Sequence, residues 1–189
     1  EILGAPRSGG PEETLRAVRE GFLRKYDLVW LEPLGFNNAF AMVVTGEKAR
    51  ELGLRTISDL KAHPSLRYGI SLEFLERADG WNPLLEAYGL PREGMTVRGL
   101  QHGLAYEALT AGQIDVTNAY TTDGKLERFG LVALEDDRGF FPPYHAVPVI
   151  RGEILRAHPE VGRTLAMLAG SLTDRQMQSL NYRVEERKE

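Results

Sequence analysis

The sequence contains no cysteine, which excludes disulfide bridges and thiolate metal sites. Its four histidines, at positions 63, 102, 145 and 158, lie far apart, and no two have the four-residue spacing of a helical zinc site. Phosphate-binding motifs of the G-x-G-x-x-G and P-loop types are absent, as is the G-x-S-x-G nucleophile motif. We therefore expect no metal, no cofactor and no catalytic residues.

Long apolar runs and an excess of basic residues are also lacking. No stretch approaches the roughly 18 apolar residues of a membrane-spanning helix, and the first residues do not form a basic-then-apolar signal region. The 23 Lys and Arg residues are outnumbered by 27 Asp and Glu residues, and both signs are spread along the chain. Without a basic stripe to neutralise phosphates, nucleic acid is not an expected partner.

The sequence does contain short apolar runs that alternate with helix-like segments. With 42% hydrophobic residues among 189, the chain can form a substantial core. The predicted strands cover residues 27–31, 36–44, 68–72, 95–101, 115–120, 131–134 and 146–150. Helices are predicted from residue 11, at 46–51, 81–88 and 102–112, after a capping box at 56–59, and at 154–172 and 173–186. This alternation is typical of an α/β architecture with a mostly parallel sheet.

The stretch from Asp115 to Gly124 is the first candidate for a ligand site. It has the pattern of a buried strand whose exit carries Tyr120, followed by Thr-Thr-Asp. Ligands of open α/β sheets bind beyond the carboxyl ends of strands, which favours contact between Tyr120 and a small molecule. A half-buried tyrosine beside a Thr/Asp-capped turn explains the same residues, and both interpretations stay open at this stage.

Other candidates lie at further strand exits and stiff turns. Arg77 and Glu73 follow the predicted strand 68–72 in a charged run that is either a solvated face or part of a site. Two prolines stiffen the approach to Tyr144, as suits an aromatic side chain held ready for a ligand. Phe40 lies in a strand that is apolar on both faces, so it is also a candidate for plain core.

These side-chain types together suggest a zwitterionic ligand. The faces of Phe40, Tyr120 and Tyr144 can surround a quaternary ammonium group, which needs neutralising but donates no hydrogen bonds. The Arg77 guanidinium can bind a carboxylate at the other end of the molecule. By spacing alone the pattern is unspecific, because seven Tyr and seven Phe offer many such trios.

Three runs resemble the substrate-binding proteins of glycine betaine/choline/carnitine ABC importers. These are YDLVWLEPLGFNNAFAM at 26–42, GLAYEALTAGQIDVTNAYTTDG at 103–124 and LEDDRGFFPPY at 134–144. The resemblance implies a type II periplasmic-binding-protein-like fold whose two lobes close on the ligand like a hinge. It places Tyr120 and Tyr144 on aromatic-cage positions and Phe40 where many members have Tyr. It also places Arg77 on or next to the residue that holds a betaine carboxylate, with Asn38 as a weaker polar neighbour.

The resemblance further implies that the first lobe is incomplete, since family members carry more residues ahead of this start. Residues 35–145 are then expected to form the complete second lobe, and residues 1–34 and 146–189 the remaining part of the first. Such a chain is expected to bind ligand weakly or not at all alone. Its exposed first-lobe surface can drive dimerisation.

The sequence thus predicts a solute receptor without enzymatic activity. It would capture a quaternary-ammonium osmolyte at the periplasmic or extracellular face of the cytoplasmic membrane and deliver it to ABC permease subunits. Alternatives are a receptor for another trimethylammonium compound such as ergothioneine, and a ligand-sensing regulatory domain of the same fold. A small α/β hydrolase or transferase with Asp123 or His102 as base is the competing enzyme hypothesis.

Overall fold

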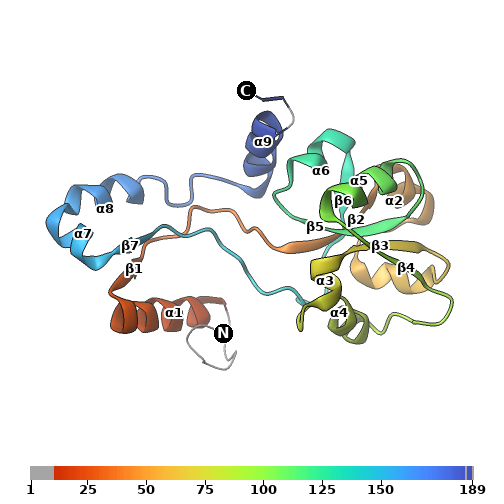
Figure 1. Cartoon of the computed structure of the whole chain (residues 1–189), viewed down its shortest axis with the longest axis horizontal. Helices are drawn as coiled ribbons and strands as arrows, with labels where there is room; N and C mark the ends of the chain where they lie inside the picture. Colours follow the sequence, from red (N-terminus) through yellow and green to blue (C-terminus); the bar gives the residue numbers. More distant parts are fainter. Residues whose placement is uncertain (1–10, 186, 189) are drawn as a thin grey trace. The chain divides into compact units, whose positions relative to one another are not determined.

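The computed structural model describes residues 11–185, 187 and 188, and the chain divides into two compact units (Figure 1). Unit 1 consists of the residues up to Asn38 together with Pro142–Gln176, and unit 2 of Ala39–Phe141 together with the residues from Met177 onward. Within the described residues, none of the helices has the length and hydropathy needed to cross a membrane. The lobe boundaries expected near residues 35 and 145 stay a prediction.

Unit 1 is built on an antiparallel ribbon of two strands, β1 (Leu28–Trp30) and β7 (Val149–Arg151). Backbone hydrogen bonds continue the pairing along the chain, and the last of them joins the Asn38 N–H to the Tyr144 carbonyl at 3.0 Å. The helices of this unit are α1 (Pro11–Tyr26), α7 (Gly152–Ala157) and α8 (Pro159–Ala166). The predicted strand 146–150 therefore begins later than expected, although its first residues already lie in the ribbon.

Unit 2 contains a mixed sheet of five strands in the order β4-β3-β5-β2-β6 (Figure 1). The strands are β2 (Phe40–Thr45), β3 (Arg67–Ser71), β4 (Thr96–Leu100), β5 (Val116–Tyr120) and β6 (Leu131–Ala133). β3 pairs in parallel with β4 and β5, whereas β2 pairs antiparallel with β5 and β6. The α/β architecture with a mixed sheet is confirmed, but parallel pairs do not predominate, because alternation along the sequence does not determine strand direction.

Both faces of this sheet are covered by helices. Phe40, Met42 and Val44 point into a core formed with η1 (Ile57–Ala62), α3 (Leu72–Glu76) and α4 (Trp81–Tyr88). Ala41 and Val43 point into a second core with α5 (His102–Thr110) and α6 (Gly124–Phe129). Successive side chains of a strand face opposite sides, so a run that is apolar at every position fits a strand covered twice. Figure 1 shows α3 and α4 on one side of the sheet and α5 and α6 on the other.

Several helices begin and end at residues that the sequence indicates. Thr56 and Asp59 form the predicted capping box at the start of η1, each side chain accepting the backbone N–H of the other. Gly89, with φ at +59°, ends α4 in the left-handed conformation that glycine adopts without strain. The helices found near their predicted positions are α2 (Gly46–Leu52), α4 (Trp81–Tyr88), α5 (His102–Thr110) and α9 (Asp174–Glu185).

Two short helices were not predicted, α3 (Leu72–Glu76) and α6 (Gly124–Phe129). With 5 and 6 residues, they are too short for an apolar periodicity to be visible in the sequence. The hydroxyl of Ser71 caps α3 by accepting the Phe74 N–H at 3.3 Å. α3 directly follows β3, whereas residues 121–123 form a turn between the end of β5 and the start of α6.

Candidate ligand site

Three strand ends meet at one edge of the sheet in unit 2. Ser71 ends β3 and Tyr120 ends β5, and these parallel neighbours reach the same edge. Phe40 begins β2, and the antiparallel register of β2 with β5 sets it opposite Tyr120. We expected Phe40 within a strand that begins at residue 36, near its exit. It stands instead at the strand's entry, and its ring reaches the site because β2 runs in the opposite direction.

A cluster of aromatic rings covers this edge. The ring centroid of Phe40 lies 4.8 Å from that of Tyr120 and 4.9 Å from that of Phe74. The ring of Phe141 completes the cluster at 6.3 Å from Phe40 and 6.1 Å from Phe74. Phe74 and Phe141 were not predicted as site residues. The only local signal for Phe141 is its place in the FFPPY run, and Phe74 has none beyond its position after a strand.

Phe40 and Tyr120 differ in exposure. Only 7% of Phe40 is exposed, and it belongs to the hydrophobic core that includes α3 and α4, whereas Tyr120 is half-buried at the border of that core. The two interpretations of Phe40, core residue and site wall, are therefore compatible. Its ring packs in the core and at the same time supports the face of the cluster that Tyr120 extends.

Arg77 follows α3 and lies beside Phe40. The guanidinium carbon is 5.3 Å from the centroid of the Phe40 ring, a cation–π arrangement. Arg77 Nε and Nη2 donate to the two carboxylate oxygens of Asp79 at 2.8 and 3.0 Å, and Nη1 lies 3.6 Å from an oxygen of Glu73. The bidentate fork is thus engaged by Asp79, and any bound carboxylate has to compete with that side chain for it.

The hydroxyl of Tyr120 is held by Glu73. It donates to Glu73 Oε2 at 3.3 Å. Burial, followed by the negative charge of Glu73, raises the pKa of Tyr120, so its hydroxyl remains protonated and keeps donating in neutral solution. The edge of the ring cluster therefore carries Glu73 and Asp79, two acidic side chains, with Arg77 as their common cation.

Asp123 ties Tyr120 to α5. Its Oδ2 accepts the Tyr120 N–H at 3.0 Å, lies 3.0 Å from His102 Nε2 and also accepts the hydroxyl of Tyr106. Burial by itself raises the pKa of Asp123, but the hydrogen bonds from His102, Tyr106 and the Tyr120 N–H outweigh burial and leave it below its ordinary value. Asp123 is therefore a stable anion directly behind Tyr120.

His102 and Tyr106, predicted as surface and packing residues, both contact this anion. Tyr106 is 1% exposed, so it packs as expected, but its hydroxyl is also bonded to Asp123. The His102 ring lies 5.2 Å from the ring of Tyr120 and 5.2 Å from that of Tyr106. His102 is half-buried and stands next to the proposed cage residue, which the helical pattern of residues 102–110 did not indicate.

A buried polar contact locks β3 to β5 beneath the rings. Asn118 Oδ1 accepts the Ser71 N–H at 2.7 Å, and Asn118 Nδ2 donates to the Ser71 hydroxyl at 2.9 Å. Both residues are buried, and their hydrogen bonds align the ends of β3 and β5. Removing either side chain would leave buried polar groups of the other residue without a partner, which destabilises the protein.

The turn after Tyr120 is also held by α9. Gln178 Nε2 donates to the Thr121 carbonyl at 2.6 Å, and Asn181 Nδ2 donates to the Thr122 carbonyl at 2.9 Å. These contacts join segments that are far apart in the sequence, and the local sequence pattern of α9 does not predict them.

Two of the predicted site residues, Tyr144 and Asn38, belong to unit 1. Tyr144 is 38% exposed, and its backbone carbonyl accepts the Asn38 N–H at 3.0 Å. The neighbouring Asn37 holds this segment, because its side-chain oxygen accepts the Tyr144 N–H while its own N–H donates to Asp174 Oδ1. Within unit 1, Asn37 therefore positions Tyr144, a role that the sequence did not assign to it.

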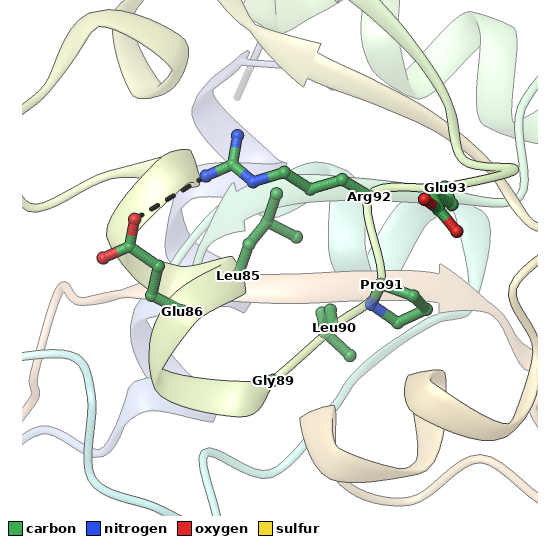
Figure 2. A pocket seen from close by; sticks show the side chains of 7 residues that line it. All are labelled: Leu85, Glu86, Gly89, Leu90, Pro91, Arg92 and Glu93. Carbon is green, nitrogen blue, oxygen red and sulfur yellow. Dashed lines mark ion pairs between the residues drawn. The ribbon is translucent and has the colours of Figure 1, made fainter.

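A separate surface hollow of about 520 Å³ lies at the end of α4 (Figure 2). Its lining residues are Leu85, Glu86, Gly89, Leu90, Pro91, Arg92 and Glu93. Arg92 reaches Glu86 across it at 3.7 Å, and none of the predicted site residues lines it. Within residues 11–185, 187 and 188, no group of three or more His, Asp or Glu side chains is arranged to hold a metal ion.

Comparison with known proteins links this geometry to a family. Residues 11–189 match the family described as the substrate binding domain of ABC-type glycine betaine transport system. The chain is 36% identical over 182 residues to the carnitine transport binding protein OpuCC of Listeria monocytogenes. This match covers 95% of this chain and 58% of that protein. It is 39% identical over 168 residues to a glycine-betaine-binding protein of Pseudomonas aeruginosa, covering 84% of this chain and 54% of that protein.

A solved structure, described as that of a glycine betaine/carnitine/choline ABC transporter, has the same fold. It matches with a TM-score of 0.91 at 36% identity, covering 100% of this chain and 69% of that one. The chain spans little more than half the length of the two relatives, at 58% and 54%.

Proposed function

Because this chain belongs to the family of substrate-binding domains of ABC-type glycine betaine transport systems, we propose that it forms part of a receptor for a quaternary-ammonium compound. The family and the periplasmic-binding-protein-like α/β fold expected from the sequence are confirmed. The proposed ligands are glycine betaine, choline, carnitine or a similar trimethylammonium compound. The proposed place of action is outside the cytoplasmic membrane, with ABC permease subunits as partners.

The observation that carries this proposal is the ring cluster at the sheet edge. Tyr120 and Phe40 lie 4.8 Å apart in register on neighbouring strands, and Tyr120 is half-buried, so part of its ring is open to a ligand. Two acidic side chains lie at the same edge. Glu73 accepts a hydrogen bond from the Tyr120 hydroxyl, and Asp123 accepts one from the Tyr120 backbone N–H. Aromatic faces backed by negative charge attract a cation that cannot donate hydrogen bonds.

Arg77 is proposed to hold the carboxylate of a ligand that has one. Its guanidinium already lies over Phe40, at 5.3 Å, and binds Asp79 through two donors. A ligand carboxylate would share or replace the Asp79 contact. Replacing Arg77 with Ala should therefore weaken binding of glycine betaine more than binding of choline, which has no carboxylate.

Tyr144 and Asn38 remain predicted ligand contacts, supported by the sequence resemblance. Their part is tested separately by calorimetry of Tyr144→Ala and Asn38→Ala in the full-length protein that contains this chain. Unchanged affinity in either variant removes that residue from the proposed site.

The central experiment is isothermal titration calorimetry on the full-length protein with choline, glycine betaine, carnitine and ergothioneine. We expect at least one of these compounds to bind, Tyr120→Ala to abolish that binding and Tyr120→Phe to retain most of it, because the ring is kept. Thermal unfolding of each variant confirms that it is folded. Unchanged affinity of a folded Tyr120→Ala variant would contradict the proposed site.

Binding without covalent chemistry is part of the proposal. Asp123 and His102 are the candidate bases of the competing enzyme hypothesis. They form a hydrogen bond to each other, and Asp123 also accepts the Tyr120 N–H. Turnover of a choline ester by the purified full-length protein, lost on Asp123→Asn, would overturn this part of the proposal.

A further inference from the structure

The proposed function uses the negative charge of Asp123 behind Tyr120 but gives its partner His102 no role in ligand binding. His102 Nε2 lies 3.0 Å from Asp123 Oδ2, and the His102 ring lies 5.2 Å from the ring of Tyr120. The same carboxylate oxygen accepts the Tyr120 N–H at 3.0 Å. The pair therefore touches Tyr120 both at its ring and at its backbone.

The charge of this pair depends on the protonation of one ring. The pKa of Asp123 lies below its ordinary value, so its carboxylate keeps its negative charge in neutral and weakly acidic solution. With a neutral imidazole the pair carries one negative charge, and with an imidazolium it carries none. Histidine is the side chain whose reference titration falls between about pH 5 and pH 8, so binding measured at these two pH values tests the charge of the pair.

Other charged and titratable groups around the pair lie on α5, α6 and α9. On α5 itself, Tyr106 donates to Asp123 and stays protonated, because burial, followed by the charge of Asp123, raises its pKa. The Lys125 ammonium nitrogen of α6 lies 5.5 Å from the centroid of the Tyr106 ring. The negative charge of Glu185 in α9 also contributes to raising the pKa of Tyr106.

The remaining neighbours act through Tyr120, which ends β5. Glu73 of α3 accepts a hydrogen bond from the Tyr120 hydroxyl and raises the pKa of that hydroxyl. The positive charge of Arg77 lowers the same pKa. Among these groups, His102 is the histidine.

We propose that the His102–Asp123 pair is a charge determinant of the ligand site, favouring a cationic group on Tyr120 while His102 is neutral and weakening it when His102 is protonated. This inference rests on the proposed function, because it requires the ligand cation to contact Tyr120. At a separation of about 6 Å in an aqueous environment, one unit of charge changes affinity about threefold, and more where water is excluded.

The experiment is calorimetry of choline binding to the full-length protein at pH 8 and pH 5.5. Choline carries the same charge at both values, so the pH dependence reports on the protein. We expect the wild-type affinity to fall about three- to tenfold at pH 5.5, and His102→Gln, which keeps a side-chain donor for Asp123, to lose most of this dependence. His63→Gln, a substitution in η1's C-terminal turn, should keep it.

A second measurement does not depend on any variant. Choline binding near pH 6.5 should release protons, measured by calorimetry in two buffers of different ionisation enthalpy. A pH-independent affinity without proton release, or a His102→Gln variant with the full wild-type dependence, overturns the inference. Binding that survives Tyr120→Ala overturns the proposed site itself, so the two failures are distinguishable.

Discussion

The ring of Phe40 lies 4.8 Å from the ring of Tyr120 because β2 and β5 run antiparallel and set these two residues opposite each other. Phe40 is the first residue of β2, and Tyr120 is the last residue of β5. Their contact thus links the core of unit 2 directly to the half-buried ring that we propose as the main ligand contact.

Removing the aromatic face of Phe40 should weaken ligand binding. In the full-length protein, Phe40→Leu keeps an apolar side chain in the core but loses the π face beside Tyr120, so we expect about fivefold or greater loss of affinity for the best ligand. Phe40→Tyr should bind about as well as wild type. Calorimetry measures both.

The matched control for Phe40→Leu is Met42→Leu, two residues along the same face of β2 and fully buried. It should change stability by less than about 1.5 kcal/mol and leave affinity unchanged. Equal affinity of Phe40→Leu and Met42→Leu would show that Phe40 is core only.

Asn118→Ala should destabilise the sheet edge. The substitution leaves the buried Ser71 N–H and hydroxyl without their Asn118 partners, which costs about 1–3 kcal/mol in the free energy of unfolding. Urea denaturation of the full-length protein measures the loss. Thr110→Ala, at an exposed position on α5, serves as the control and should change stability by less than about 0.5 kcal/mol. A loss no larger than that of the control would contradict the structural role of Asn118.

The Arg67–Asp115 pair should make unit 2 sensitive to acid. Asp115 accepts Arg67 Nε at 2.8 Å and the Arg67 backbone N–H at 2.9 Å. The hydrogen bonds from Arg67, together with its charge, hold the pKa of Asp115 below its ordinary value, although burial opposes this. Since the folded-state pKa is lowered, the stabilisation is present above the unfolded-state pKa of about 3.9 and is lost as the pH falls through the folded-state value.

Asp115→Asn should therefore lower the free energy of unfolding at pH 7 and reduce its fall on acidification below about pH 5. Urea denaturation between pH 7 and pH 3 gives both quantities. Glu93→Gln, an exposed acid in the loop after α4, should retain the wild-type pH profile. An Asp115→Asn profile parallel to that of wild type would mean that the pair contributes no pH-dependent stability.

Adding one methyl group to Gly124 should disturb the packing of α9 behind Tyr120. A Cβ at Gly124 would lie 2.5 Å from the Tyr182 backbone nitrogen, and a rigid helix has to shift to admit it. We expect Gly124→Ala to cost about 1–3 kcal/mol in unfolding free energy and to weaken ligand binding through the turn that follows Tyr120.

Gly103→Ala is the matched control for Gly124→Ala. Its Cβ would come no closer than 3.7 Å to the Lys125 ammonium nitrogen, the flexible end of a side chain. Because alanine favours helix over glycine, this change in α5 should stabilise the protein by about 0.5 kcal/mol. Thermal unfolding distinguishes the two signs, and equal effects of both substitutions would refute the close packing of α9.

Much of the fold was predictable because its signals are local. The capping box at Thr56 and the terminating Gly89 act within one turn of a helix, and the apolar run of β2 reports that both of its faces are covered. The short helices α3 and α6 were missed, since five or six residues carry too little periodicity. Tyr120 was identified as a candidate because a buried strand ends there, which is visible in the sequence itself.

The sequence by itself determined the family, the α/β alternation, most helix ends and the candidacy of Tyr120, all of which depend on motifs or on residues close together in the chain. Only the tertiary structure decided that Phe40 stands opposite Tyr120, that Asp79 engages Arg77 and that Asp123 joins His102 to Tyr120. Strand direction and side-chain contacts arise from the packing of distant segments, where many pairings satisfy the same local pattern and only the folded chain selects one.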